Sequence, residues 1–166
     1  MAKAKRILIA ADASQASRQA VDYVVQMVRG RPEFHVALLH LELPPRMLEW
    51  GGSESPQVEE GVSQERAEDY RRLEKDALEE GRALLETMKK TLVDNGIDVA
   101  ALFVKFDEPL DPKQIADDIL KTASERDYGT VVVGRHTLSG LKRWFQHYVG
   151  EELVRIGKGV TVWVVE

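Results

Sequence analysis

Residues 6–14 have the sequence Arg6-Ile7-Leu8-Ile9-Ala10-Ala11-Asp12-Ala13-Ser14. Every position after Arg6 is apolar as far as Ala11, and such an unbroken run is typical of a parallel strand that is covered on both faces. Asp12 ends the run, and Ser14 is a suitable N-cap for a following helix. The stretch therefore predicts a buried strand that leads directly into a helix, which is the first half of a β-α-β unit.

The helix after Ser14 is predicted to direct small and apolar residues inward at helical spacing, at Ala16, Ala20, Val24 and either Met27 or Val28. Gly30 and Pro32 end it. Further strands are predicted at about residues 34–41, 99–106, 130–133 and 160–165, and further helices at about 65–95, from 112 onwards, and 141–156. This alternation predicts an α/β fold with an open, doubly wound, five-stranded parallel sheet and helices on both faces.

Two of the predicted helices carry more specific expectations. The helix at 65–95 is predicted to be an ordinary surface helix rather than a coiled coil, because its apolar stripe lasts only about three heptads and includes Gly81. The apolar positions of that helix are Tyr70, Leu73, Ala77, Leu84 and Met88, with Leu78, Leu85 and Leu92 beside them. Asp111 is predicted to cap the next helix, with Pro112 at its first position and Ile115, Ile119 or Leu120, and Ala123 inward.

Residues 42–64 have no apolar period and contain three of the six prolines, so they are predicted to form a long flexible loop. Met47, Leu48 and Trp50 lie in the middle of this loop. Two interpretations remain open for them. They pack against the body of the protein, or they gate a pocket or contact a partner.

The chain has 166 residues with 23 Lys and Arg against 28 Asp and Glu, and no cysteine. This length predicts a single domain over residues 1–166. A net charge of −5 argues against binding to nucleic acid or to an anionic membrane surface. The apolar runs are shorter than a signal peptide or the ~20 residues of a membrane span require. A cytoplasmic location is expected.

Ligands of open α/β sheets bind at the carboxyl ends of the strands, where the strand order reverses. The loop after the first strand holds Asp12 but no glycine pattern of a dinucleotide or P-loop site. Asp12 either binds a ligand or caps the helix. The loop after the fourth strand combines Gly134, Thr137, Ser139 and Gly140 with a helix start, which are elements of an anion site.

These two loops on this alternation of elements resemble the universal stress protein family over essentially the whole chain. The resemblance is carried by residues 6–14, by Leu38-Leu39-His40-Leu41, by residues 115–120 and most specifically by residues 130–165. It implies an adenine nucleotide alpha-hydrolase-like sheet. It also implies a pocket between Asp12, Leu41 and the loop 134–140.

Family members that bind ATP have an Asp at the end of the first strand and a G-x-x-G, nine residues, G-[ST] motif. Asp12 matches that Asp, and Gly134 matches the first glycine. The remaining three motif positions fall on Thr137, His147 and Tyr148, which differ from the family pattern. Because these side chains are bulkier than glycine or serine, ATP binding is predicted to be weak or lost.

No catalytic or metal site is predicted. The four histidines lack metal-ligand spacing, and His136 with Ser139 lacks an orienting acid. The strand at Val160–Val165 has no internal charge or proline, and the family topology places it at a sheet edge, so a homodimer through this strand is expected. The predicted function is a dimeric, non-enzymatic stress-response module for binding or signalling. The alternative is an ATP-binding switch that uses Mg²⁺ and slow hydrolysis at the loop after the fourth strand.

Overall fold

The computed structural model describes residues 5–12, 14–42, 64–105, 112–135 and 143–166. Five parallel strands form one sheet in the order β3-β2-β1-β4-β5. The chain continues from β1 to β2 on one side, and β4 pairs with β1 on the other side, so the order reverses at β1. The predicted open, doubly wound α/β sheet is confirmed. The strands are β1 (Arg6–Ala11), β2 (His35–Glu42), β3 (Val99–Lys105), β4 (Thr130–Gly134) and β5 (Thr161–Val165).

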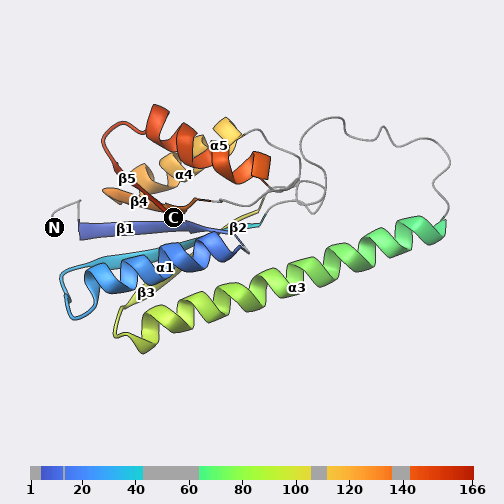
Figure 1. Cartoon of the computed structure of the whole chain (residues 1–166), viewed down its shortest axis with the longest axis horizontal. Helices are drawn as coiled ribbons and strands as arrows, with labels where there is room; N and C mark the ends of the chain where they lie inside the picture. The colour runs from blue at the N-terminus through green and yellow to red at the C-terminus, as the bar shows by residue number, and fades with distance from the viewer. Residues whose placement is uncertain (1–4, 13, 43–63, 106–111, 136–142) are drawn as a thin grey trace.

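Helices cover both faces of the sheet (Figure 1). On one face lie α1 (Gln15–Val28) and α3 (Gln64–Asp94), and on the other lie α4 (Pro112–Glu125) and α5 (Arg143–Ile156). Alternate residues of β1 enter the two cores: Ile7 and Ile9 pack with α1 and α3, whereas Leu8 packs with α4 and α5. All three side chains are fully buried, as expected of a central strand of a parallel sheet.

The start of α1 is capped as the sequence predicts. Ser14 has an extended backbone, and its Oγ accepts a hydrogen bond from the Ser17 backbone N–H at 3.2 Å. The buried face of α1 includes Ala16, Ala20 and Val24. Of the two alternatives for its last inward position, Val28 is buried, whereas Met27 is 39% exposed.

The 31 residues of α3 make a helix about 46 Å long. Its C-terminal half packs on the sheet through Leu85, Met88 and Leu92, and Leu84 is half-buried beside them. The side chains of Tyr70, Leu73, Ala77 and Leu78 lie outside the described residues. Figure 1 shows the N-terminal half of α3 extending past the edge of the sheet at which the strands end.

The inner face of α4 also follows the prediction. Pro112 is its first residue, and Ile115, Ile119 and Ala123 are fully buried, while Leu120 is only partly buried. Asp111 and most of the predicted loop, residues 43–63, lie outside the described residues, and Glu42 and Gln64 belong to β2 and α3. None of the helices in the described ranges combines the length and apolar character needed to cross a bilayer.

Candidate functional site

Asp12, Leu41 and Gly134 come together at the carboxyl edge of three adjacent strands. Ala11 of β1 is in register with His40 of β2, so the next residues, Asp12 and Leu41, follow at the same level. On the other side of β1, Ile9 pairs with Val132, and Gly134 lies two residues further along β4. This is the point at which the strand order reverses, where ligands of doubly wound sheets bind.

The carboxylate of Asp12 is held by the first turn of α1. The Ser17 hydroxyl donates a hydrogen bond to Asp12 Oδ1 at 2.7 Å and accepts one from the Asp12 backbone N–H at 3.1 Å. The N-cap of α1 is Ser14, so Asp12 is not the capping residue, and ligand binding by Asp12 stays a prediction. Asp12 is partly exposed. A partly exposed carboxylate at this edge can accept a hydrogen bond from a ligand hydroxyl or amine.

Gly134 and Leu41 contribute to the site through packing. A β-carbon built on Gly134 would lie 2.1 Å from the Ala16 carbonyl oxygen, well inside any allowed contact. The absence of a side chain at Gly134 therefore lets the first turn of α1 lie directly against the tip of β4. Leu41 is 8% exposed and belongs to the core beneath α4 and α5, so it forms an apolar floor next to Asp12.

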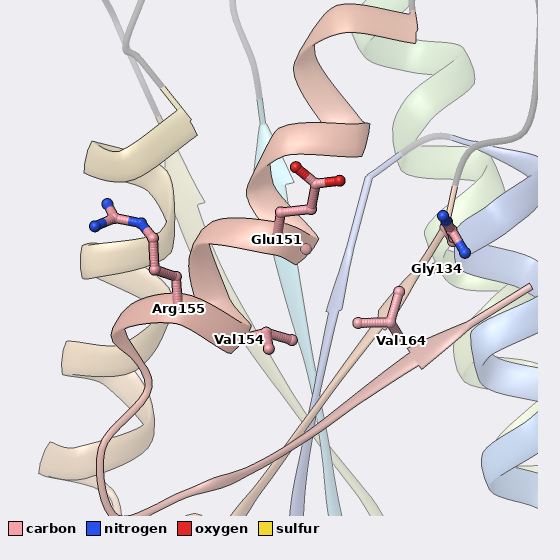
Figure 2. Close-up of a pocket in the computed structure, with 7 residues that line it drawn as sticks. Gly134, Glu151, Val154, Arg155 and Val164 are labelled. Carbon is pink, nitrogen blue, oxygen red and sulfur yellow. The ribbon is translucent and has the colours of Figure 1, made fainter.

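An open pocket of about 330 Å³ lies on the α5 side of the same sheet edge. It is lined by Gly134, Arg135, Gly150, Glu151, Val154, Arg155 and Val164. Figure 2 shows Val154 of α5 and Val164 of β5 facing the space between this helix and this strand, while the Arg155 guanidinium points away from it. Of the predicted site residues that the structure describes, Gly134 is the one in this lining, so the pocket adjoins the end of β4 at the predicted site.

The two arginines of this pocket are held in ion pairs. Arg135 pairs with Glu166, and its backbone N–H donates to the Val165 carbonyl, which extends the β4–β5 pairing. Arg155 Nε donates to Glu152 at 3.0 Å. The hydrogen bond and the charge of Glu152 raise the pKa of the Arg155 guanidinium. Both guanidinium groups are therefore paired with carboxylates of the same chain.

The remaining predicted site residues are only partly covered. Thr137, Ser139 and Gly140 lie outside the described residues, and His147 and Tyr148 belong to α5 with side chains outside the described part. His35 and His40 lie at positions of opposite parity on β2, as the sequence indicates. Within the described ranges, no three His, Cys, Asp or Glu side chains form a group that could hold a metal ion.

Ser17 is a site residue that the sequence analysis did not single out. It is 4% exposed and contacts Asp12 through two hydrogen bonds. Its signal in the sequence is the spacing Asp12-x-Ser14-x-x-Ser17, which places two hydroxyls three residues apart at a helix start.

Comparison with solved structures identifies the fold. A universal stress protein from Burkholderia pseudomallei aligns over 99% of this chain and 98% of its own, with a TM-score of 0.62 and 19% identity. One from Archaeoglobus fulgidus, solved with dAMP, aligns over 97% of both chains with a TM-score of 0.55 and 15% identity. One from Arabidopsis thaliana, solved with AMP, covers 96% of this chain and 90% of its own, with a TM-score of 0.56 and 18% identity.

None of the curated proteins compared with the chain matches it. The model of the universal stress protein family, in contrast, matches residues 3–165. This match spans nearly the whole chain, including β1 with Asp12 and the segment from β4 to β5. The solved structures above share the same sheet and helix arrangement. The chain therefore belongs to the universal stress protein family.

Proposed function

We propose that this universal stress protein is a dimeric, non-enzymatic stress-response module of the cytoplasm whose ligand is an adenine mononucleotide. In this proposal the adenosine part of the ligand lies against Asp12, Leu41 and Gly134. ATP with Mg²⁺ binds weakly or not at all. The observation that carries the proposal is the Asp12 carboxylate, fixed at the point where the strand order reverses and partly exposed there.

The chemistry of Asp12 supports recognition of the nucleoside end. An ionised carboxylate accepts hydrogen bonds and donates none, so its ligand partner must be a donor. Ribose hydroxyls and the exocyclic amine of adenine are donors of this kind, whereas phosphate oxygens are not. Leu41 adds apolar surface beside the carboxylate. A base or sugar therefore fits the neighbourhood of Asp12 better than a phosphate chain does.

The residues that depart from the family motif favour a ligand with a short phosphate chain. Glycines at these motif positions allow phosphate oxygens to approach backbone N–H groups closely, and Thr137 and His147 replace two of them. Tyr148 replaces the hydroxyl position with a bulkier group. The relatives from A. fulgidus and A. thaliana were solved with dAMP and AMP, which each carry one phosphate.

Two surfaces beside β5 support the dimer. The exposed large apolar side chains of the described residues are Tyr23, Met27, Val93, Val154 and Val164. Tyr23 packs edge-to-face on Trp163 of β5 with ring centroids 5.8 Å apart, and Met27 is one turn further along α1. On the other face of the same strand, Val164 lines a pocket together with Val154 of α5. An edge strand flanked by apolar side chains on both faces is suited to pairing with a second copy of the chain.

Calorimetric titration of the purified protein with AMP, cAMP and ATP, with and without Mg²⁺, tests the ligand. We expect AMP to bind more tightly than ATP, and Asp12→Ala to weaken AMP binding by at least about tenfold, the loss of one charge-assisted hydrogen bond. Tighter binding of ATP with Mg²⁺, followed by release of ADP, would favour the ATP-binding switch instead. Absence of binding for all three nucleotides would refute the proposal.

A further inference from the structure

The hydroxyl of Ser17 lies at the centre of a small hydrogen-bond network at the start of α1. Ser17 Oγ donates to Asp12 Oδ1 at 2.7 Å and accepts from the Asp12 backbone N–H at 3.1 Å. Ser14 Oγ lies 3.2 Å from it and donates to it. A serine hydroxyl has one donor and two acceptor positions, so all three positions of Ser17 are occupied. Its proton is consequently committed to the Asp12 carboxylate.

This network does more than cap the helix. The cap itself is Ser14, whose Oγ accepts from the Ser17 backbone N–H. In a capping box, the side chain at the third helical position bonds the backbone of the cap residue. Ser17 occupies that position but instead bonds Asp12, two residues before the cap. Its hydroxyl therefore joins the end of β1 to the start of α1 and fixes the Asp12 side chain.

The first turn of α1 is in turn fixed against the sheet. Ala16, which directly precedes Ser17, places its carbonyl oxygen where a β-carbon of Gly134 would be. Ser17 itself is 4% exposed, whereas Asp12 is partly exposed. A buried hydroxyl on a closely packed turn thus contacts a partly exposed carboxylate. Within the described ranges, the hydrogen bond to the Asp12 carboxylate is the one that Oδ1 accepts from Ser17.

We propose that Ser17 is a positioning residue for nucleotide binding, which holds the Asp12 carboxylate in the orientation that accepts a hydrogen bond from the ligand. This inference rests on the proposed function, because it deepens the role of Asp12 in the same site. A side chain that is already ordered loses no rotamer freedom when the ligand binds. Removal of the Ser17 hydroxyl should therefore lower the affinity for the ligand only as long as the Asp12 carboxylate is present.

A double-mutant cycle measures this dependence. The Kd for AMP is determined by calorimetry for the parent protein, Ser17→Ala, Asp12→Ala and the double variant. We expect Ser17→Ala to weaken AMP binding about tenfold, the order of the cost of immobilising a side chain. In the Asp12→Ala background the same substitution should change the Kd by less than about twofold, because the group that it positions is gone.

Ser14→Ala is the matched control. It also removes one hydroxyl from this turn and costs helix stability, but Ser14 Oγ makes no hydrogen bond to the Asp12 side chain in the described structure. We expect a lower Tm and an AMP Kd within about twofold of the parent value. If Ser14→Ala weakens AMP binding as much as Ser17→Ala does, and both do so equally in the Asp12→Ala background, general destabilisation of the turn explains the loss and the positioning role is wrong.

A ligand-free readout separates this inference from the proposed function. The Hα–Hβ coupling constants of Asp12 report whether its side chain occupies one rotamer. We expect one rotamer in the parent and averaged couplings in Ser17→Ala. If the parent protein binds no AMP, the proposed function fails. If the Asp12 coupling constants of Ser17→Ala are the same as those of the parent, the positioning role is overturned, whether or not AMP binds. If AMP binds but Ser17→Ala weakens it equally with and without the Asp12 carboxylate, only the positioning role is overturned.

Discussion

Gly134 and Ala16 are in direct backbone contact: a β-carbon on Gly134 would lie 2.1 Å from the Ala16 carbonyl oxygen and 2.2 Å from its carbonyl carbon. The residue that matches the first glycine of the family motif is thus required by the packing of α1 on β4. Ser17, which follows Ala16 in α1, donates a hydrogen bond to the Asp12 carboxylate. The ends of β1 and β4 therefore depend on the same helical turn.

Substitution of two glycines by alanine should change the free energy of unfolding in opposite directions, because only Gly134 makes this close contact. Gly134→Ala should lower the free energy of unfolding by about 3 kcal/mol, towards the upper end of the usual cost of overpacking, because backbone atoms must move. Gly150→Ala should raise it by about 0.5–1 kcal/mol, since the residue is helical and the nearest atom to its new β-carbon is 3.7 Å away. Urea denaturation at one protein concentration compares the two. Equal effects of the same sign would contradict the packing argument.

A charge at the edge strand should disrupt the proposed dimer. Val164 is 38% exposed on β5, so Val164→Lys should leave the fold of one chain intact while placing a cation in the proposed interface. We expect sedimentation equilibrium to give a dimer for the parent and a monomer for this variant. Val93→Lys is the matched control, because Val93 is 54% exposed on α3, away from β5, and should not change the mass. A dimeric Val164→Lys variant would place the interface elsewhere.

The motif departures predict a gain of binding. The combined substitution Thr137→Gly, His147→Gly and Tyr148→Ser restores the family pattern. If these side chains are what excludes a triphosphate, the variant should bind ATP with Mg²⁺ at least about tenfold more tightly than the parent, a gain of about 1.4 kcal/mol. Calorimetry measures the change, and circular dichroism checks that the helix remains formed. An unchanged ATP affinity in a folded variant would show that residues other than these three determine which nucleotide binds.

Two adjacent residues of α3 test which part of this helix is anchored. Leu92 is fully buried, and Leu92→Ala should cost about 2–5 kcal/mol of unfolding free energy through the cavity that it leaves. Val93, the next residue, is 54% exposed, and Val93→Ala should change stability by less than about 0.5 kcal/mol. Thermal unfolding of both variants gives the comparison. Similar costs for the two would mean that α3 does not pack on the sheet as described.

The fold could be predicted because its signals are local. The bounds of β1 and the cap at Ser14 follow from a few consecutive residues, and the structure agrees with both. The choice between Met27 and Val28 could not be made from spacing, because both positions fall near the inward face of α1. In the structure Val28 joins Val24 in the core, whereas Met27 lies one turn beyond Tyr23, which packs on Trp163 and is itself 39% exposed. These two aromatic residues are far apart in the sequence.

The candidate site could be predicted only in part. The position of Asp12, Leu41 and Gly134 at the strand ends could be predicted because strand ends are readable from the sequence and because the family resemblance points to these positions. Ser17 was missed because a serine inside a helix start is usually a local cap, and its bond to Asp12 depends on the angle between β1 and α1. The contact of Gly134 with Ala16 is a backbone contact between distant segments, which no side-chain pattern reports.

Gly134 also lines the pocket between α5 and β5, on the side of β4 that faces away from Ala16. With no side chain between them, the first turn of α1 rests directly on the backbone of β4, and the other side of that backbone lines the pocket. A substitution at Gly134 should therefore disturb this strand on both of its faces at once.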